Sequence, residues 1–151
     1  VCFSIDGNTS LVYRNLNESE DSFLFDVFDR IADANGHAST TSPYFIGHRI
    51  TFDLKFLWRR AKVLNIGLPF KLPFRGRHRT DFFDNAAEWC EYNEYISQDK
   101  LAKALGLGGK PDDINGSNVW DHVKAGDIQR VAEYNQSDVE TVIEIYERLV
   151  Y

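Results

Sequence analysis

The sequence predicts a mixed fold, α/β or α+β in class, because strand patterns come first along the chain and helical patterns dominate its second half. With 151 residues, the chain suits a single domain spanning 1–151. Its 43% hydrophobic and 14% aromatic content can build a core and excludes a disordered chain. No apolar run is long enough to span a membrane. Two cysteines fit a reducing, cytoplasmic setting rather than a disulfide scaffold.

The first part of the chain alternates strand and helix patterns. Alternating apolar and polar side chains around the turn residues Asp6-Gly7-Asn8 predict a hairpin. An apolar stripe of helical period that stops at Gly36 predicts a helix, since glycine readily adopts the backbone conformation that ends helices. In order, the expected elements are strands at 1–6 and 10–14, a helix at 19–35, a strand at 44–47 and a helix at 51–65.

The second part is a basic loop followed mainly by helices. Proline and glycine interrupt the pattern between residues 68 and 77, which indicates a loop. Asp84, Ser97, Ser117 and Asp127 precede helical patterns and are residue types that cap helix starts. The expected elements are a strand at 79–83, a short helix from 84 to 89, helices at 97–105 and 119–124, and a long helix from 127 to 149.

Positive charge is concentrated between Arg49 and Arg79, although the whole chain has a net charge of −6. Asp53 is the only acid in this stretch. Interleaved cations and rings are typical of single-strand grooves, where cations hold phosphates and rings stack on bases. A solvated basic face with its rings in the core has the same pattern, and is favoured on this feature alone. The residues are Arg49, Lys55, Arg59, Arg60, Lys62, Lys71, Arg75, Arg77 and Arg79, with Phe52, Phe56, Trp58, Phe70 and Phe74.

Two aspartates and a tyrosine form the candidate functional constellation. Tyr134 and Asp138 are one helical turn apart and share a face with apolar residues of the final helix. Asp53 falls in the first turn of a helix that follows a strand. Each aspartate alone fits a carboxylate on the surface or at a helix start. A carboxylate on an apolar face is nevertheless costly unless it meets a polar partner. Together they suggest oxygen ligation of a hard divalent cation.

Four segments carry a family resemblance. Gly47-His48-x-x-x-Phe52-Asp53-x-x-Phe56-Leu57 and Tyr134-x-x-x-Asp138 are similar to the second and third motifs of the DEDD-type 3′–5′ exonucleases, the third in its tyrosine variant. Ile96-Ser97-x-Asp99-Lys100-Leu101-x-x-x-Leu105-Gly106 and Asn115-Gly116-Ser117-x-Val119-Trp120 resemble stand-alone members. The subgroup is the one related to the proofreading domain of family-B DNA polymerases. The resemblance implies a ribonuclease H-like mixed sheet flanked by helices.

The chain departs from this family at two places. The family's first motif, Asp-x-Glu on the central first strand of the sheet, is absent. We therefore expect the natural protein to continue N-terminally of Val1, and expect this chain, an incomplete exonuclease-like domain, to be inactive alone. Arg49 stands where members often carry Asn after His, in the neighbourhood of the substrate.

The resemblance implies a metal-dependent hydrolase that acts on the 3′ ends of single-stranded DNA, in repair or phage replication, and releases nucleoside 5′-monophosphates. It implies two ions, Mg²⁺ or Mn²⁺, that clamp the attacking and leaving oxygens. Asp53 and Asp138 are then catalytic metal ligands, and Tyr134 orients the attacking water. Three alternatives stay open: the same chemistry on RNA, a non-catalytic nucleic-acid-binding relic, and a purely structural domain.

The candidates for binding the nucleic-acid strand are residues around the second motif. For the rings of Phe52 and Phe56, a place in the core is favoured over base stacking. The basic loop at 71–79 is a further candidate for strand binding. The candidate strand-binding residues are His48, Arg49, Phe52, Arg59 and Arg60.

Overall fold

The computed structural model of the protein describes residues 2–5, 8–11, 18–36, 42–108 and 113–151. The chain divides into two compact units. The middle unit is Val12–Trp89, and the terminal unit combines Val1–Leu11 with Cys90–Tyr151. None of the helices in the described segments is long and apolar enough to cross a membrane.

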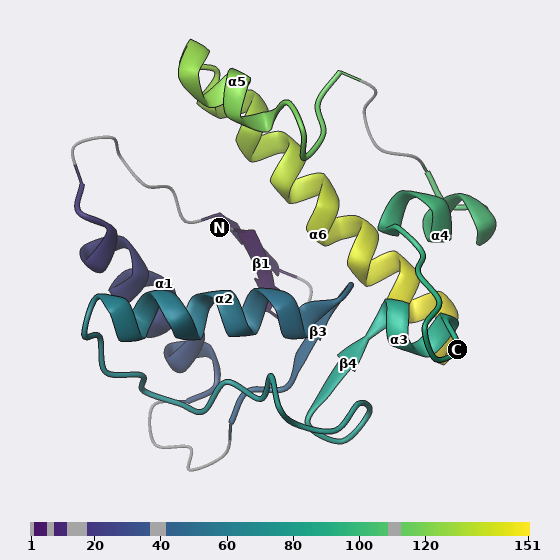
Figure 1. The fold of residues 1–151 in the computed structure, drawn as a ribbon, viewed down its shortest axis with the longest axis horizontal. Helices are drawn as coiled ribbons and strands as arrows, with labels where there is room; N and C mark the ends of the chain where they lie inside the picture. The colour runs from purple at the N-terminus through teal and green to yellow at the C-terminus, as the bar shows by residue number, and fades with distance from the viewer. Residues whose placement is uncertain (1, 6–7, 12–17, 37–41, 109–112) are drawn as a thin grey trace. The chain divides into compact units, whose positions relative to one another are not determined.

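The middle unit pairs two short parallel strands with helices. Figure 1 shows β3 and β4 side by side, and their register places Gly47 opposite Asp84. Because the strands are parallel, their carboxyl ends lie at the same edge, where α2 and α3 begin. In chain order the elements are α1 (Glu20–Ala34), β3 (Phe45–Gly47), α2 (Ile50–Val63), β4 (Phe82–Asp84) and α3 (Asn85–Trp89).

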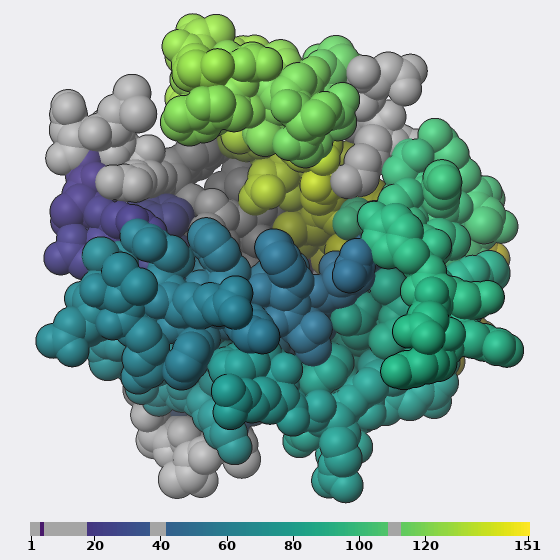
Figure 2. Space-filling view, in the orientation of Figure 1, coloured from purple at the N-terminus to yellow at the C-terminus, as the bar shows by residue number. Residues whose placement is uncertain are grey.

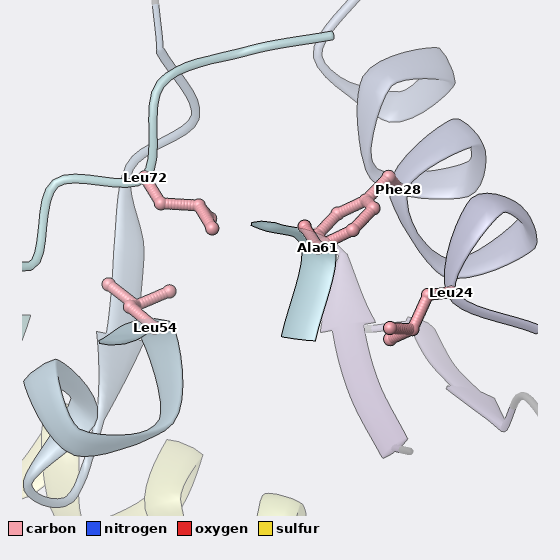
Figure 3. Close-up of a cluster of buried hydrophobic side chains, with 5 residues drawn as sticks. All are labelled: Leu24, Phe28, Leu54, Ala61 and Leu72. Carbon is pink, nitrogen blue, oxygen red and sulfur yellow. The ribbon is translucent and has the colours of Figure 1, made fainter. Parts of the chain in front are cut away.

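The core of the middle unit lies between α1, α2 and the loop that follows α2. Figure 3 shows the side chains of Phe28 from α1, Leu54 from α2 and Leu72 from the loop converging in this core. Leu24 and Ala61 complete the set of buried residues. The spacing of Leu54 and Ala61 puts both on one face of α2, so this helix buries one stripe and leaves the opposite stripe outside.

Most rings of the basic segment pack against this core. The Phe70 ring lies 6.2 Å from that of Phe28 and 6.2 Å from that of Phe45. The Trp58 and Phe74 rings are 5.5 Å apart. For Trp58, Phe70 and Phe74 the expectation of a core position is therefore confirmed.

The terminal unit contains a hairpin and the long C-terminal helix. β1 (Cys2–Ile5) and β2 (Asn8–Leu11) pair antiparallel, as the alternating pattern predicts. The helices are α4 (Gln98–Ala104), α5 (Val119–Ala125) and α6 (Ile128–Val150), the last drawn in yellow in Figure 1. Leu101 and Ala102 of α4 pack against Ile145 of α6 in a second buried cluster. The expected turn at 6–8 is not fully covered by the described residues, because Asp6 and Gly7 lie outside them.

The described strands form an antiparallel pair, β1–β2, and a parallel pair, β3–β4, and together with the helices they agree with the expected mixed class. Two details of the expected elements need correction. The strand expected at 79–83 is confined to β4, since Arg79 adopts a left-handed conformation (φ 65°) and a turn precedes the strand. The residue that precedes α5 is Asn118 rather than Ser117, because the Ser117 hydroxyl is bonded instead to the side chain of Asn115.

Candidate active site

A tight turn joins β3 to α2 and places Asp53 near the carboxyl ends of the strands. Gly47 ends β3, and a Cβ on this residue would lie 2.6 Å from Cδ1 of Ile50, so only glycine fits without displacing Ile50. Arg49 then adopts a left-handed conformation (φ 59°, ψ 38°), which reverses the chain direction before α2 begins. Asp53 follows in the first turn of α2, as the sequence predicts.

The Asp53 carboxyl group has a perturbed pKa. Surrounding protein displaces solvent and raises the pKa of Asp53 above its ordinary value of 3.8, although the residue as a whole remains exposed. A backbone hydrogen bond lowers the pKa of Asp53 in part, and the negative charge of Asp84, the smallest of the three effects, raises it. A cation bound at Asp53 would relieve both costs, which agrees with a role in metal ligation.

Asp84, at the end of β4, is a buried carboxylate that the sequence predicts only as a helix cap. The cap is confirmed, because Oδ1 accepts hydrogen bonds from the main-chain N–H groups of Ala86 (3.0 Å) and Ala87 (3.4 Å). The same oxygen also accepts one from Arg49 N–H at 2.8 Å. Only the parallel pairing of β3 with β4 brings these two turns together, and no local pattern in the sequence signals it.

The outer face of α2 is apolar and open. Phe52 is 71% exposed and Phe56 is 55% exposed, so the expectation that these two rings lie in the core is wrong. They are one turn apart and opposite the buried stripe of Leu54 and Ala61. Figure 2 shows the surface of α2, in blue to teal, on the face in view.

Cations accompany these rings along α2. Lys55 and Arg59 are exposed, and their positions place them beside the stripe of Phe52 and Phe56. Arg60 is engaged elsewhere: its Nε and Nη2 donate to the two carboxylate oxygens of Glu20 at 2.6 and 2.5 Å, which ties α2 to α1. Of the two candidate strand-binding arginines on α2, Arg59 is exposed, whereas Arg60 is half-buried in its ion pair with Glu20.

In the terminal unit, α6 carries Tyr134 and Asp138 one turn apart. Tyr134 is buried (9% exposed), and Asp138 is half-buried. The Gln98 side chain, at the start of α4, donates from Nε2 to the main-chain carbonyl of Asp138 at 2.8 Å. This bond links the two helices at the level of Asp138, a connection that helical periodicity alone does not predict.

Comparison with known proteins identifies the family. Residues 70–151, more than half of the chain, match the model of a family described as a predicted 3′–5′ exonuclease related to the exonuclease domain of PolB. The chain belongs to this family. No curated protein and no solved structure matches it. The matched part of the chain includes Tyr134 and Asp138, whereas Asp53 precedes it.

The candidate residues are divided between the two units. The start of α2, in the middle unit, brings together His48, Arg49, Phe52 and Asp53. Tyr134 and Asp138 belong to the terminal unit. Within the described ranges, no group of three or more His, Cys, Asp or Glu side chains is placed to hold a metal ion. Carboxylate oxygens such as those of Asp53 and Asp138 are of the type that suits a hard divalent cation.

Proposed function

We propose that this protein is a metal-dependent 3′–5′ exonuclease that hydrolyses the terminal phosphodiester of single-stranded DNA and releases nucleoside 5′-monophosphates. The observation that carries the proposal is the pair Tyr134 and Asp138, one turn apart on α6 inside the segment that matches the exonuclease family. Asp53, an exposed residue at the start of α2 whose carboxyl group has a raised pKa, supports it independently.

The chemistry of Asp53, Tyr134 and Asp138 allows a role for each in this reaction. Asp53 and Asp138 would hold two divalent ions, Mg²⁺ or Mn²⁺, which when bound supply Lewis-acid stabilisation of the attacking and leaving oxygens. The Tyr134 phenol donates and accepts hydrogen bonds and so can orient the attacking water; with an ordinary pKa of about 10, a phenol is poorly suited to act as the base at neutral pH. The reaction forms a bond from the water oxygen to phosphorus and breaks the bond to the 3′ oxygen.

The outer face of α2 would contact the strand. Phe52 and Phe56 offer exposed rings on which bases stack, and Arg59 offers a cation for the phosphates. This combination favours a single strand, because bases in a duplex are already stacked on one another. His48 and Arg49, in the turn before α2, are further proposed contacts to the strand.

The direct test is Asp138→Asn in the full-length protein. The change is nearly isosteric, so the fold should be retained while the negative charge needed for a metal ligand is lost. We expect release of mononucleotides from a 3′-labelled single strand to fall at least roughly a thousandfold. Glu144→Gln, an exposed residue on the same helix, is the matched control and should keep the wild-type rate. Wild-type activity in Asp138→Asn would show that the assigned site is wrong.

A further inference from the structure

One buried oxygen connects two turns at the carboxyl ends of β3 and β4. Asp84 is 5% exposed. Its Oδ1 accepts from Arg49 N–H at 2.8 Å, in the β3–α2 turn, and from Ala86 and Ala87 N–H at 3.0 and 3.4 Å, in the first turn of α3. A buried carboxylate is costly unless its oxygens accept hydrogen bonds, and the charge strengthens the bonds that it accepts.

The β3–α2 turn needs such support because its own conformation is unfavourable. Arg49 is a non-glycine residue with φ 59°, a conformation that costs L-residues free energy. Its side chain makes no capping hydrogen bond to α2. On the strand side, the backbone of Gly47 lies so close to the Ile50 side chain that a Cβ on Gly47 would clash with it, and the turn therefore has little room to relax. The bond from Arg49 N–H to Asp84 is therefore a local interaction that favours this geometry over its alternatives.

We infer that Asp84 is a positioning residue, which holds the β3–α2 turn through Arg49 N–H and thereby fixes where the first turn of α2 presents Asp53. This inference rests on the proposed function, in which Asp53 is a metal ligand. Asp84 itself neither binds metal nor transfers a proton in this role. Displacement of a ligand by about 1 Å is enough to slow an enzyme roughly a hundredfold, so a support of this kind affects the rate directly.

Two substitutions separate the bridge to Arg49 from the cap on α3. Asp84→Asn keeps an oxygen at Oδ1 and can accept all three bonds. Asp84→Ser keeps a residue that caps α3 well, but its shorter side chain does not reach Arg49. Comparison of the two therefore isolates the bond to Arg49, while retention of the α3 cap preserves the fold.

The experiment measures the hydrogen exchange of the Arg49 amide and the steady-state cleavage of a short single-stranded oligonucleotide with Mg²⁺, in the full-length protein. We expect Asp84→Asn to stay within about threefold of wild type in both. For Asp84→Ser we expect Arg49 exchange to accelerate about tenfold and kcat to fall roughly 10–100-fold with KM nearly unchanged. A KM effect without a kcat effect would contradict a role in positioning Asp53.

Three other outcomes would overturn the inference. In the first, the Arg49 amide of Asp84→Ser exchanges as slowly as that of the wild type. In the second, Asp84→Ser exchanges rapidly at Arg49 but keeps the wild-type kcat. In the third, Asp84→Asn loses as much kcat as Asp84→Ser although its Arg49 amide is still protected. If the wild-type protein shows no nuclease activity, the proposed function fails. The Arg49 exchange rates and the Asp53 amide chemical shifts of the variants then still decide whether Asp84 holds the turn. An Arg49 amide that exchanges rapidly in the wild-type protein would overturn it without any variant.

Discussion

At the scale of single residues, Asp53 has a carboxyl group whose pKa is shifted by the surrounding protein. Loss of solvent around its carboxyl group and the nearby charge of Asp84 both disfavour ionisation and raise its pKa. The unfavourable charge is understandable if a cation is bound there, since the cation stabilises the ionised form.

Asp53→Asn should therefore stabilise the metal-free protein at neutral pH, by roughly a few tenths of a kcal/mol because the residue keeps contact with solvent. Below pH 3.8, the ordinary value, the carboxyl group is protonated in both the folded and the unfolded chain, and the two proteins should be equally stable. As pH rises from 3.8 through the raised folded pKa, the wild type alone loses stability. Denaturant melts at several pH values in EDTA measure this difference; a less stable Asp53→Asn at neutral pH would contradict the prediction.

Tyr134 tests whether a buried ring on α6 contributes its hydroxyl to the reaction. The ring is 9% exposed, and Tyr134→Phe keeps its packing while it removes only the oxygen. If the phenol orients the attacking water, kcat should fall roughly 10–100-fold with little change in KM, because the interaction is made mainly in the transition state. Steady-state kinetics on a short oligonucleotide measure this. An unchanged kcat would assign Tyr134 to packing alone.

At the scale of elements, α2 combines a buried face with an exposed aromatic face. Its inner stripe of Leu54 and Ala61 closes the core of the middle unit, and Arg60 adds an ion pair to α1. Phe52 and Phe56, on its outer stripe, are so exposed that their rings contribute little to the packing of the core. Exposed rings beside cations are the composition of single-strand binding surfaces.

Phe56→Ala should weaken strand binding without unfolding the protein. One stacked base contributes about 1–3 kcal/mol, so the affinity for a labelled oligonucleotide should fall about tenfold. Stability should change by less than about 1 kcal/mol, because Phe56 is 55% exposed, whereas loss of a core phenylalanine costs about 3–5 kcal/mol. Fluorescence anisotropy and denaturant melts measure the two quantities. Phe25→Ala, which is 61% exposed on α1, is the matched control and should leave affinity unchanged.

At the scale of the whole molecule, the metal-binding capacity of the 151-residue chain follows from its donors. The described part of the chain has no group of three or more suitable side chains around one point. Affinity for a hard cation depends on the number of charged ligands, so we expect Mn²⁺ to bind this chain with a Kd of about 1 mM or weaker. Titration calorimetry measures this. Tight binding at two sites would contradict the expectation that further ligands are needed.

The sequence by itself determined the features that depend on neighbours along the chain. The helix of Tyr134 and Asp138 follows from apolar periodicity, the helix start at Asp53 from the turn before it, and the cap role of Asp84 from its place ahead of α3. The family follows from motifs of the same kind, short segments with fixed spacing. Each of these signals is local, because backbone propensity and helical spacing act over only a few residues.

Only the tertiary structure decided which surfaces are covered and which distant groups meet. Phe52, Phe70 and Phe74 belong to one basic, aromatic stretch, yet the structure exposes Phe52 and packs the other two against the core. Arg60 pairs with Glu20 across 40 residues of sequence, and the Asp84 carboxylate accepts a hydrogen bond from Arg49 N–H across 35. Such contacts depend on how helices and strands pack, and a local pattern is compatible with many packings, so the sequence alone does not select among them.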